Sequence, residues 1–555
     1  MSLEAFAEQN GPAAGRRLTG LYSRTFLAYL LGMILMWVVG LEALFYHPTP
    51  FYALYDPVFP TLLTPAFMVA LFLGVYVGFG ASFTHLRSDG RPPGHFAMLA
   101  VMLYGVAVLG AMLWDAARGE EGMLAELLSH WEHLRWHLLA LLVFTAFFGL
   151  LLTVLPWYEG LTLELPPKPT AGVLAVIMLF IFLFSGSIAM IRGGPDGIQQ
   201  AYERRDAEFV GDIGMGGSIR GLFSDYERIH EHLSMHGKVH PPGPTALLWI
   251  LSYFVGRGPL ALSLATMAFG SLAVIPLYLL ARDLGNQRIA FTACLIYAVV
   301  PTVVLFTATS ANILFMPFTI ATLFLFWRAL FQCSAQYALA AGVFYAFMSL
   351  LSFSLIGVGA FFGIAGLWAL TRKRLRFSVI QTAALMLLTF LGVHALVWWW
   401  SGFDMIAAFQ MAKAQFDLDQ AQLQQLSPRY PGWAWRILNP LAWFYFAGIP
   451  VSILFIWRLF ARVPSAHYFG VSPEAGSRGL YVVFFLTLAA LNLLYLGRGE
   501  GERSAMHIIP FLVIPAAFAI DHLSRSARSY APLAATLGFL AFQCWFTESY
   551  FYTYW

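Results

Sequence analysis

The sequence predicts an all-α polytopic membrane protein with about 15 transmembrane helices and further helices lying at the outer membrane surface. Of its 555 residues, 59% are hydrophobic and only 11% are charged. The mean hydropathy is +0.70, which is typical of an integral membrane protein and not of a soluble domain. The net charge of +3 gives no indication of nucleic-acid binding, so we expect no nucleic-acid partner.

Apolar stretches long enough to cross a bilayer recur along the whole chain. A bilayer core about 30 Å thick requires about 20 apolar residues in a helix. We divide the chain into an N-terminal four-helix region (1–170), a transmembrane core (171–400) and a C-terminal transmembrane region (401–555). The predicted spans are 24–45, 61–84, 96–115, 136–157, 171–190, 259–281, 289–306, 312–331, 335–351, 354–371, 377–399, 438–460, 479–496, 505–522 and 531–548.

Orientation follows from the Lys and Arg residues of the short loops, which favour the cytoplasmic side. The apolar segment 243–256 is the point on which the assignment depends. As a helix it would be about 21 Å long, too short to span. We therefore expect it to lie at the outer interface, which places the basic run 372–376 inside. The long loops 191–258 and 400–437 then both lie outside.

The loop 191–258 gathers charge in a chain that has little of it. Within 218–235 the apolar residues follow the helical period, which predicts an amphipathic helix in the membrane surface. The periodic residues of this helix are Ile219, Leu222, Phe223, Tyr226, Ile229 and Leu233.

The second long loop, 400–437, contains the segment 411–426, which predicts a short helix.

Three acids of this loop are candidates for general-base chemistry: Asp206, Glu208 and Asp212. A carboxylate close to an apolar floor has a raised pKa and can accept a proton near neutral pH. The residues leave open whether Asp206 or Asp212 is the base. Candidate binding residues in the same loop are Arg205, Lys238 and His240.

The His240-Pro241-Pro242-Gly243-Pro244 unit marks the start of the short helix. Proline biases the preceding residue away from the helix and suits a helix's first turn. The unit therefore places His240 at the mouth of that helix.

A second cluster, RGEGERSAMHIIP, lies in a short loop on the predicted outer side. Arg binds phosphate through two parallel hydrogen bonds. We expect Arg503 first and Arg498 second to bind a phosphate, with Glu500 orienting Arg503. A charged arginine aimed at a leaving phosphate stabilises the charge that develops there.

Three motifs in order, RDAEFVGDI, HGKVHPPGP and LYLLARDLGNQRIAFTACLIYAVVP, resemble the membrane glycosyltransferases of the GT-C class. The protein O-mannosyltransferases and the aminoarabinose transferases of lipid A belong to that class, and the resemblance is to its HPPG-bearing branch. It is best over 171–330. It implies a GT-C-like fold with its catalytic outer loop at 191–258.

The resemblance implies a glycosyltransferase that moves a hexose or pentose from a polyprenyl-phosphate carrier, with inversion, at the outer face of the cytoplasmic membrane. The implied acceptor is a lipid, a glycan or a protein. The first-loop acid of such enzymes corresponds to Asp206, or to Asp212 in another register. Relatives often carry a further acid where this chain has Asn312, so we assign no metal site. No cofactor is assigned, and a divalent cation is left open.

A transporter or flippase for a lipid or a lipid-linked glycan is the alternative. Transporters place ionisable groups or broken helices near the bilayer midplane. Here the polar residues gather at one face instead, which favours surface chemistry. An oligosaccharide polymerase or ligase shares that surface chemistry, and the sequence does not clearly distinguish it from a single-sugar transferase.

Overall fold

The computed structural model describes a helical protein. It describes residues 135–136, 139–140, 142–144, 146–147, 149–150, 167–426, 433–460, 478–494, 501–504, 506–527 and 531–550. Every regular element in these residues is helical, which confirms the predicted all-α fold. The spans predicted before residue 135 lie outside the described residues, so the number of about 15 spans stays a prediction.

The first half of the described chain carries the long polar loop. Its α-helices are α8 (Pro167–Gly193), α9 (Asp196–Glu203), α10 (Ile219–Ser224), α11 (Tyr226–Ile229), α12 (Met235–Val239), α13 (Gly243–Val255), α14 (Pro259–Ser271), α15 (Val274–Leu284), α16 (Gln287–Tyr297) and α17 (Pro301–Thr309). Its 3-10 helices are η3 (Phe209–Asp212), η4 (His230–His232) and η5 (Ala311–Phe315).

The second half is built mainly of longer helices. These are α18 (Met316–Gln332), α19 (Ala335–Leu351), α20 (Gly359–Leu370), α21 (Arg376–Ser401), α22 (Met405–Leu426), α23 (Trp435–Phe446), α24 (Ile449–Phe460), α25 (Arg478–Leu494), α26 (Gly501–Ser504), α27 (Ile509–Ala527) and α28 (Ala531–Tyr550). The 3-10 helices are η6 (Phe353–Val358), η7 (Lys373–Leu375) and η8 (Met506–Ile508).

Six helices among the described residues are long and apolar enough to cross a membrane, or up to eight if each of two bent pairs is counted as one span. The sequence located these segments well, because apolar length and composition define both a span predicted from sequence and a helix long enough to cross a membrane. The six run over Pro169–Ile191, Pro259–Leu284, Ala311–Gln332, Phe353–Leu370, Lys373–Ser401 and Met506–Arg525.

Two predicted spans are not straight, because the chain bends inside them. The predicted span 289–306 is the pair α16 and α17, bent by 55° before Pro301. The predicted span 438–460 is the pair α23 and α24, bent by 109°. At the second bend Gly448 has a φ of 95°, and Pro450 follows. A left-handed residue and a proline together stop a helix from running through.

The short helix α13 confirms the expected helix at 243–256, and its first residue explains the glycine of the HPPG unit. A Cβ on Gly243 would lie 2.0 Å from the carbonyl oxygen of Leu350 and 3.2 Å from the backbone nitrogen of Leu351. Only glycine lets the start of α13 approach the end of α19 this closely. This contact fixes where His240 lies.

The amphipathic helix predicted over 218–235 is not continuous. The segment forms α10, α11 and η4, with a break at Asp225, whose backbone is not helical. The predicted apolar face is nevertheless right, because Leu222, Phe223, Tyr226 and Leu233 are buried. They form a separate hydrophobic cluster with Trp249 and its neighbours. Packing of these side chains, and not helical continuity, holds the loop in place.

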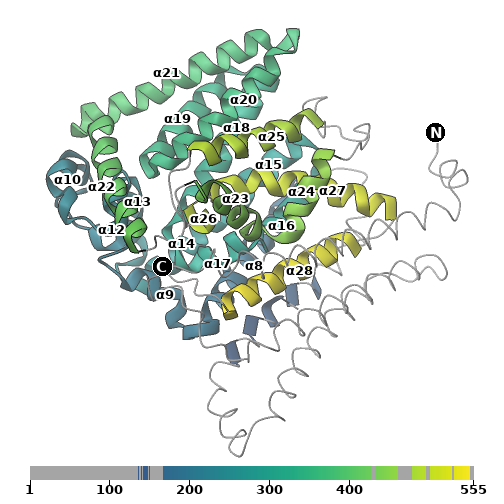
Figure 1. Cartoon of the computed structure of the whole chain (residues 1–555), viewed down its shortest axis with the longest axis horizontal. Helices are drawn as coiled ribbons and strands as arrows, with labels where there is room; N and C mark the ends of the chain where they lie inside the picture. Colours follow the sequence, from purple (N-terminus) through teal and green to yellow (C-terminus); the bar gives the residue numbers. More distant parts are fainter. Residues whose placement is uncertain are drawn as a thin grey trace, which may run out of the picture.

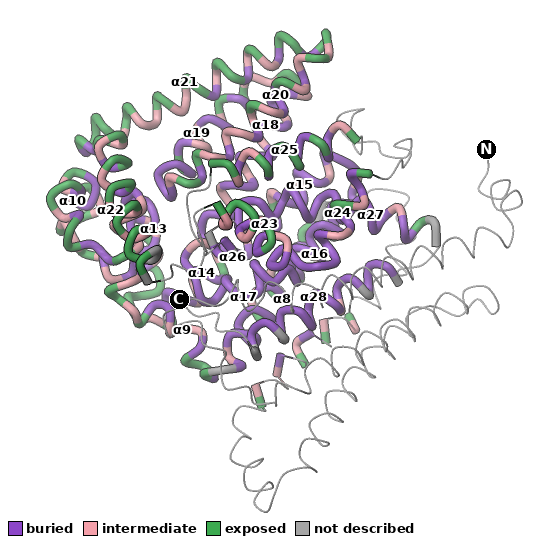
Figure 2. Tube along the Cα trace, in the orientation of Figure 1, coloured by how far each residue is buried: buried purple, intermediate pink, exposed green. Residues whose placement is uncertain are grey.

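Helix α21 lies along one edge of the molecule, packed on α19 (Figure 1). At its end the chain turns into α22, which runs back beside α11 and α12. Figure 2 shows the exposed residues along α21 and α10, and the buried ones in the centre. The exposed residues of α21 are largely apolar, as expected of a helix that faces lipid.

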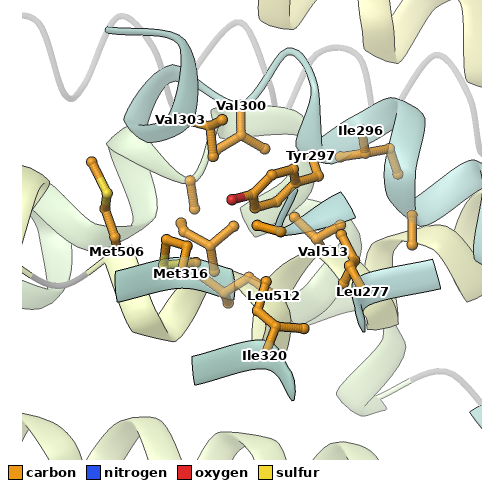
Figure 3. Packing of buried hydrophobic residues seen from close by; sticks show 14 of the residues in the cluster. Leu277, Ile296, Tyr297, Val300, Val303, Met316, Ile320, Met506, Leu512 and Val513 are labelled. Atoms are coloured by element: carbon orange, nitrogen blue, oxygen red, sulfur yellow. The ribbon is translucent and has the colours of Figure 1, made fainter. Parts of the chain in front are cut away.

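The main core fills the space between α15, α16, α18 and α27. Figure 3 shows Tyr297 at its centre, surrounded by aliphatic side chains such as Val300 and Leu512. Tyr297 is the last residue of α16, so this packing surrounds the bend towards α17. The core thus fixes the bend that the sequence did not predict.

Candidate active site

The start of α12 is held by a buried carboxylate. Asp212 is fully buried and accepts hydrogen bonds from the backbone nitrogen of Ser234 (2.6 Å) and from its hydroxyl (2.8 Å). The Ser234 hydroxyl oxygen in turn accepts from the backbone nitrogen of Gly237 at 3.0 Å. A Cβ on Gly237 would lie 2.2 Å from the Asp212 carboxylate. Both carboxylate oxygens are therefore engaged in fixing α12.

Burial raises the pKa of Asp212 to about 6, although the two hydrogen bonds from Ser234 lower it. A carboxyl group with such a pKa would suit proton transfer near neutral pH. The position of Asp212 does not suit proton transfer to a substrate, because Asp212 is not among the described residues that line the cavity described below.

Glu208, His236 and Arg503 form a chain of contacts beside Asp212. Nδ1 of His236 lies 3.3 Å from Oε1 of Glu208, and Nη2 of Arg503 lies 3.2 Å from Nε2 of His236. Nη1 of Arg503 lies 3.9 Å from Oε1 of Glu208. Only about 5% of the side chains of Glu208 and Arg503 is exposed. Glu208 and His236 of the loop thus contact Arg503, which lies 267 positions after His236 in the chain.

The electrostatics of this group keep Glu208 ionised. Burial alone would raise the pKa of its carboxyl group. The nearby imidazole of His236, followed by the guanidinium of Arg503, outweighs burial and holds the pKa below its usual range. A buried charge is tolerated when it is paired in this way.

His240 is held by its backbone and by aromatic contacts. Its carbonyl oxygen accepts a hydrogen bond from the Tyr226 hydroxyl at 2.7 Å. Its ring packs edge-on against Phe209 and at a tilt against Phe315, with centroids 5.3 and 6.2 Å away. Burial, with the nearby His236, lowers the pKa of His240 to about 3. His240 therefore presents a neutral imidazole at neutral pH.

Of these side chains, His236, His240 and Arg503 line a cavity of about 750 Å³. Most of its wall is apolar, and the described lining residues include cations and imidazoles but no carboxylate. The polar lining residues include His236, His240, Asn312, Lys413, Arg503 and His507. The apolar lining residues include Phe353, Phe409, Phe416, Trp443, Leu491 and Leu494. Such a lining suits an anion attached to an apolar body.

The cavity lies where the predicted outer connections meet. Its lining residues come from the loop 191–258, from α22 in the loop 400–437, and from the loop that carries Arg503. The starts of η5 and η6, which follow two further predicted outer turns, complete the wall. The connections assigned to one side of the membrane thus gather at one end of the molecule.

The structure brings together only some of the predicted site residues. His240, Asn312 and Arg503 line the cavity, Glu208 contacts two other residues of the group around it, His236 and Arg503, and Lys238 is half-buried on α12. Asp206 and Arg205 are exposed, and neither is among the described lining residues. Asp206 contributes through its backbone, since its carbonyl oxygen accepts from the nitrogen of Met235. Arg498 and Glu500 lie outside the described residues.

Sequence reasoning did not assign His236, Lys413 or His507 to the site. His236 stands four residues before His240, a spacing that is a weak signal without the fold. Lys413 lies in the predicted helix of the second long loop, and nothing in its neighbourhood distinguishes it from a solvated lysine. Across the described ranges, no group of three or more His, Cys, Asp or Glu side chains is arranged to hold a metal ion.

An all-helical protein with apolar helices long enough to span a membrane, and with a cavity lined by apolar side chains, cations and imidazoles, has the features expected of the GT-C enzymes. Residues 239–400 match the family model described as dolichyl-phosphate-mannose-protein mannosyltransferase. The match confirms the predicted resemblance and supports a membrane glycosyltransferase that uses a lipid-linked sugar donor. It runs from the HPPG unit to α21 and includes His240 and Asn312. No curated protein matches the chain.

Proposed function

We propose that the protein transfers a sugar from a polyprenyl-phosphate carrier to an acceptor hydroxyl at the outer face of the cytoplasmic membrane. Mannose is the first sugar to test, because the matching family is described by dolichyl-phosphate-mannose. The acceptor is a lipid, a glycan or a protein.

The cavity is the observation that supports this proposal. Its apolar walls fit the first isoprene units of a carrier lipid, and Arg503 and Lys413 at its polar parts fit the phosphate. The described lining residues include no carboxylate that would repel the phosphate. Lys413 is carried by α22, which packs against α12, so both long loops contribute to the same site.

In this reaction the acceptor oxygen attacks the anomeric carbon from the side opposite the phosphate, which inverts the configuration. One group must take the hydroxyl proton, and an acidic residue serves this proton transfer, either directly or through a neighbouring side chain. Of the three predicted acids we propose Glu208 for this role. It contacts two cavity-lining residues, whereas Asp212 is engaged by Ser234 and Asp206 is exposed.

Replacing Glu208 by alanine is therefore expected to lower turnover by about 10²–10⁴-fold, the usual effect of disabling the proton transfer. Asp206→Ala is the matched control and should stay within about twofold of the parent. The assay follows release or transfer of label from dolichyl-phosphate-[¹⁴C]mannose by the purified full-length protein. Equal loss in both variants, or in neither, would contradict the assignment of Glu208. Movement of the intact donor across a liposome membrane without sugar transfer would favour a transporter.

The outer-face location has its own test. In a background with Cys333→Ser, Glu227→Cys and Gln422→Cys should react with a membrane-impermeant maleimide applied to intact cells, whereas Arg374→Cys should not. All three parent side chains are exposed, so differences in labelling report the side of the membrane. The other two cysteines, Cys294 and Cys544, are buried. Labelling at position 374 alone would invert the proposed topology.

A further inference from the structure

The imidazole of His236 lies between a buried carboxylate and the cavity. Its helix, α12, starts at a fixed place because the backbone nitrogens of Met235 and His236 donate to the carbonyl oxygens of Asp206 and Ala207 at 2.9 and 3.0 Å. The Asp212–Ser234 hydrogen bonds hold the same turn. The ring is therefore carried by a backbone that has little freedom to move.

The partners of the ring define its tautomer. Arginine can only donate hydrogen bonds, so Nε2 of His236, at 3.2 Å from Nη2 of Arg503, is the acceptor. The proton then sits on Nδ1, which lies 3.3 Å from Oε1 of Glu208 without the alignment of a hydrogen bond. This carboxylate–imidazole arrangement leaves the basic nitrogen beside Arg503, which lines the cavity.

Glu208 is poorly placed to act on a substrate itself. It is not among the described residues that line the cavity, whereas His236 is. Its carboxylate is also a weak base, since its pKa lies below the usual range. A carboxylate behind an imidazole can instead orient the ring and stabilise the imidazolium that forms during proton transfer.

We propose that Nε2 of His236 is the atom that accepts the acceptor's proton, and that Glu208 is a positioning residue that acts through it. This inference rests on the proposed sugar transfer. The charged and titratable groups around the ring are Glu208, Asp212, Arg503 and His240, with Lys238 on its own helix, His230, Glu231 and His232 on η4, and Lys413 and His507 in the cavity wall.

The step balances without any further reagent. As the acceptor O–H attacks, the bond from the acceptor oxygen to the anomeric carbon forms and the bond from that carbon to the phosphate oxygen breaks. The hydroxyl proton passes to Nε2 of His236, and the phosphate leaves with the electron pair of the broken bond. The donor's phosphate draws Arg503 to itself and so releases Nε2 for this proton. The imidazolium then returns its proton to water or to the released phosphate.

The test compares His236→Gln, Glu208→Gln and the control His232→Gln, an exposed histidine of the same loop. The full-length protein is assayed with dolichyl-phosphate-[¹⁴C]mannose, and donor binding is measured separately. His236→Gln should lower turnover by about 10²–10⁴-fold, with the donor Kd within about threefold of the parent.

Glu208→Gln should lower turnover while leaving the donor Kd within about threefold of the parent, because the carboxylate acts through the imidazole and not on the donor. Free imidazole should restore part of the rate of His236→Ala. An unchanged rate in His236→Gln would overturn the proposal. Loss of donor binding in that variant would overturn it too, because it would identify His236 as a phosphate ligand instead. If His236→Gln does not fold, the separate effects of Glu208→Gln on turnover and on the donor Kd decide. A parent protein that neither binds nor turns over the donor would refute the sugar transfer itself.

Discussion

Arg503→Ala is expected to lower turnover by about 10²–10³-fold, the typical effect of removing a group that stabilises charge in a transition state. The leaving polyprenyl phosphate gains charge as the sugar departs, and Arg503 is a cation in the cavity wall. Arg503→Lys keeps the charge but loses the planar pair of donors, so donor binding should weaken clearly in this variant as well. The measurements are the turnover of dolichyl-phosphate-[¹⁴C]mannose and its Kd.

The matched control is Arg228→Lys in the same outer region. Arg228 is 76% exposed and pairs with Asp225, so its replacement should change neither quantity. Thermal unfolding should show that both lysine variants are folded. A fully active Arg503→Lys variant would mean that the residue only anchors the loop, whether through Glu208 or through lipid headgroups.

Gly243→Ala is expected to destabilise the protein by about 1–3 kcal/mol or more, since extra volume in a packed contact forces the backbone to shift. The added Cβ would lie 2.0 Å from the carbonyl oxygen of Leu350, which is backbone and cannot rotate away. His240 stands three residues earlier, so activity should fall together with stability. Thermal unfolding in detergent and the turnover assay measure both effects.

Gly258→Ala is the control for this change. Gly258 also stands at a helix start next to a proline, and a Cβ there would meet nothing within 4 Å. Its replacement should leave both quantities unchanged. Equal stability of the two variants would show that the start of α13 does not depend on the close approach to α19.

The sequence located the helices well, and the reason is physical. A span is defined by its apolar length, and both the prediction and the structure respond to that length. The short helix α13 was predicted from the same argument, together with its prolines. The bends were missed because they depend on local breaks that apolar composition does not reveal. The pair α23 and α24 contains as many apolar residues as a straight span does.

The candidate site was predicted less completely. The loop and Arg503 could be singled out because charge is rare in this chain. The contact between Glu208, His236 and Arg503 could not, since it joins segments 267 residues apart and depends on tertiary packing. Asp206 is exposed, whereas Glu208 and Asp212 are buried. The sequence does not indicate this difference in burial, because this part of the loop has no regular period of apolar residues.

The size of the cavity limits how much of a carrier lipid the protein can recognise. A volume of about 750 Å³ is within the range of sites that hold a drug-sized molecule. In the proposed sugar transfer, a sugar phosphate and its nearest isoprene units would fill such a space, and the rest of the carrier would extend into the bilayer. Carriers that differ only in their distal units are then expected to be equivalent substrates, because the cavity would contact only the headgroup end.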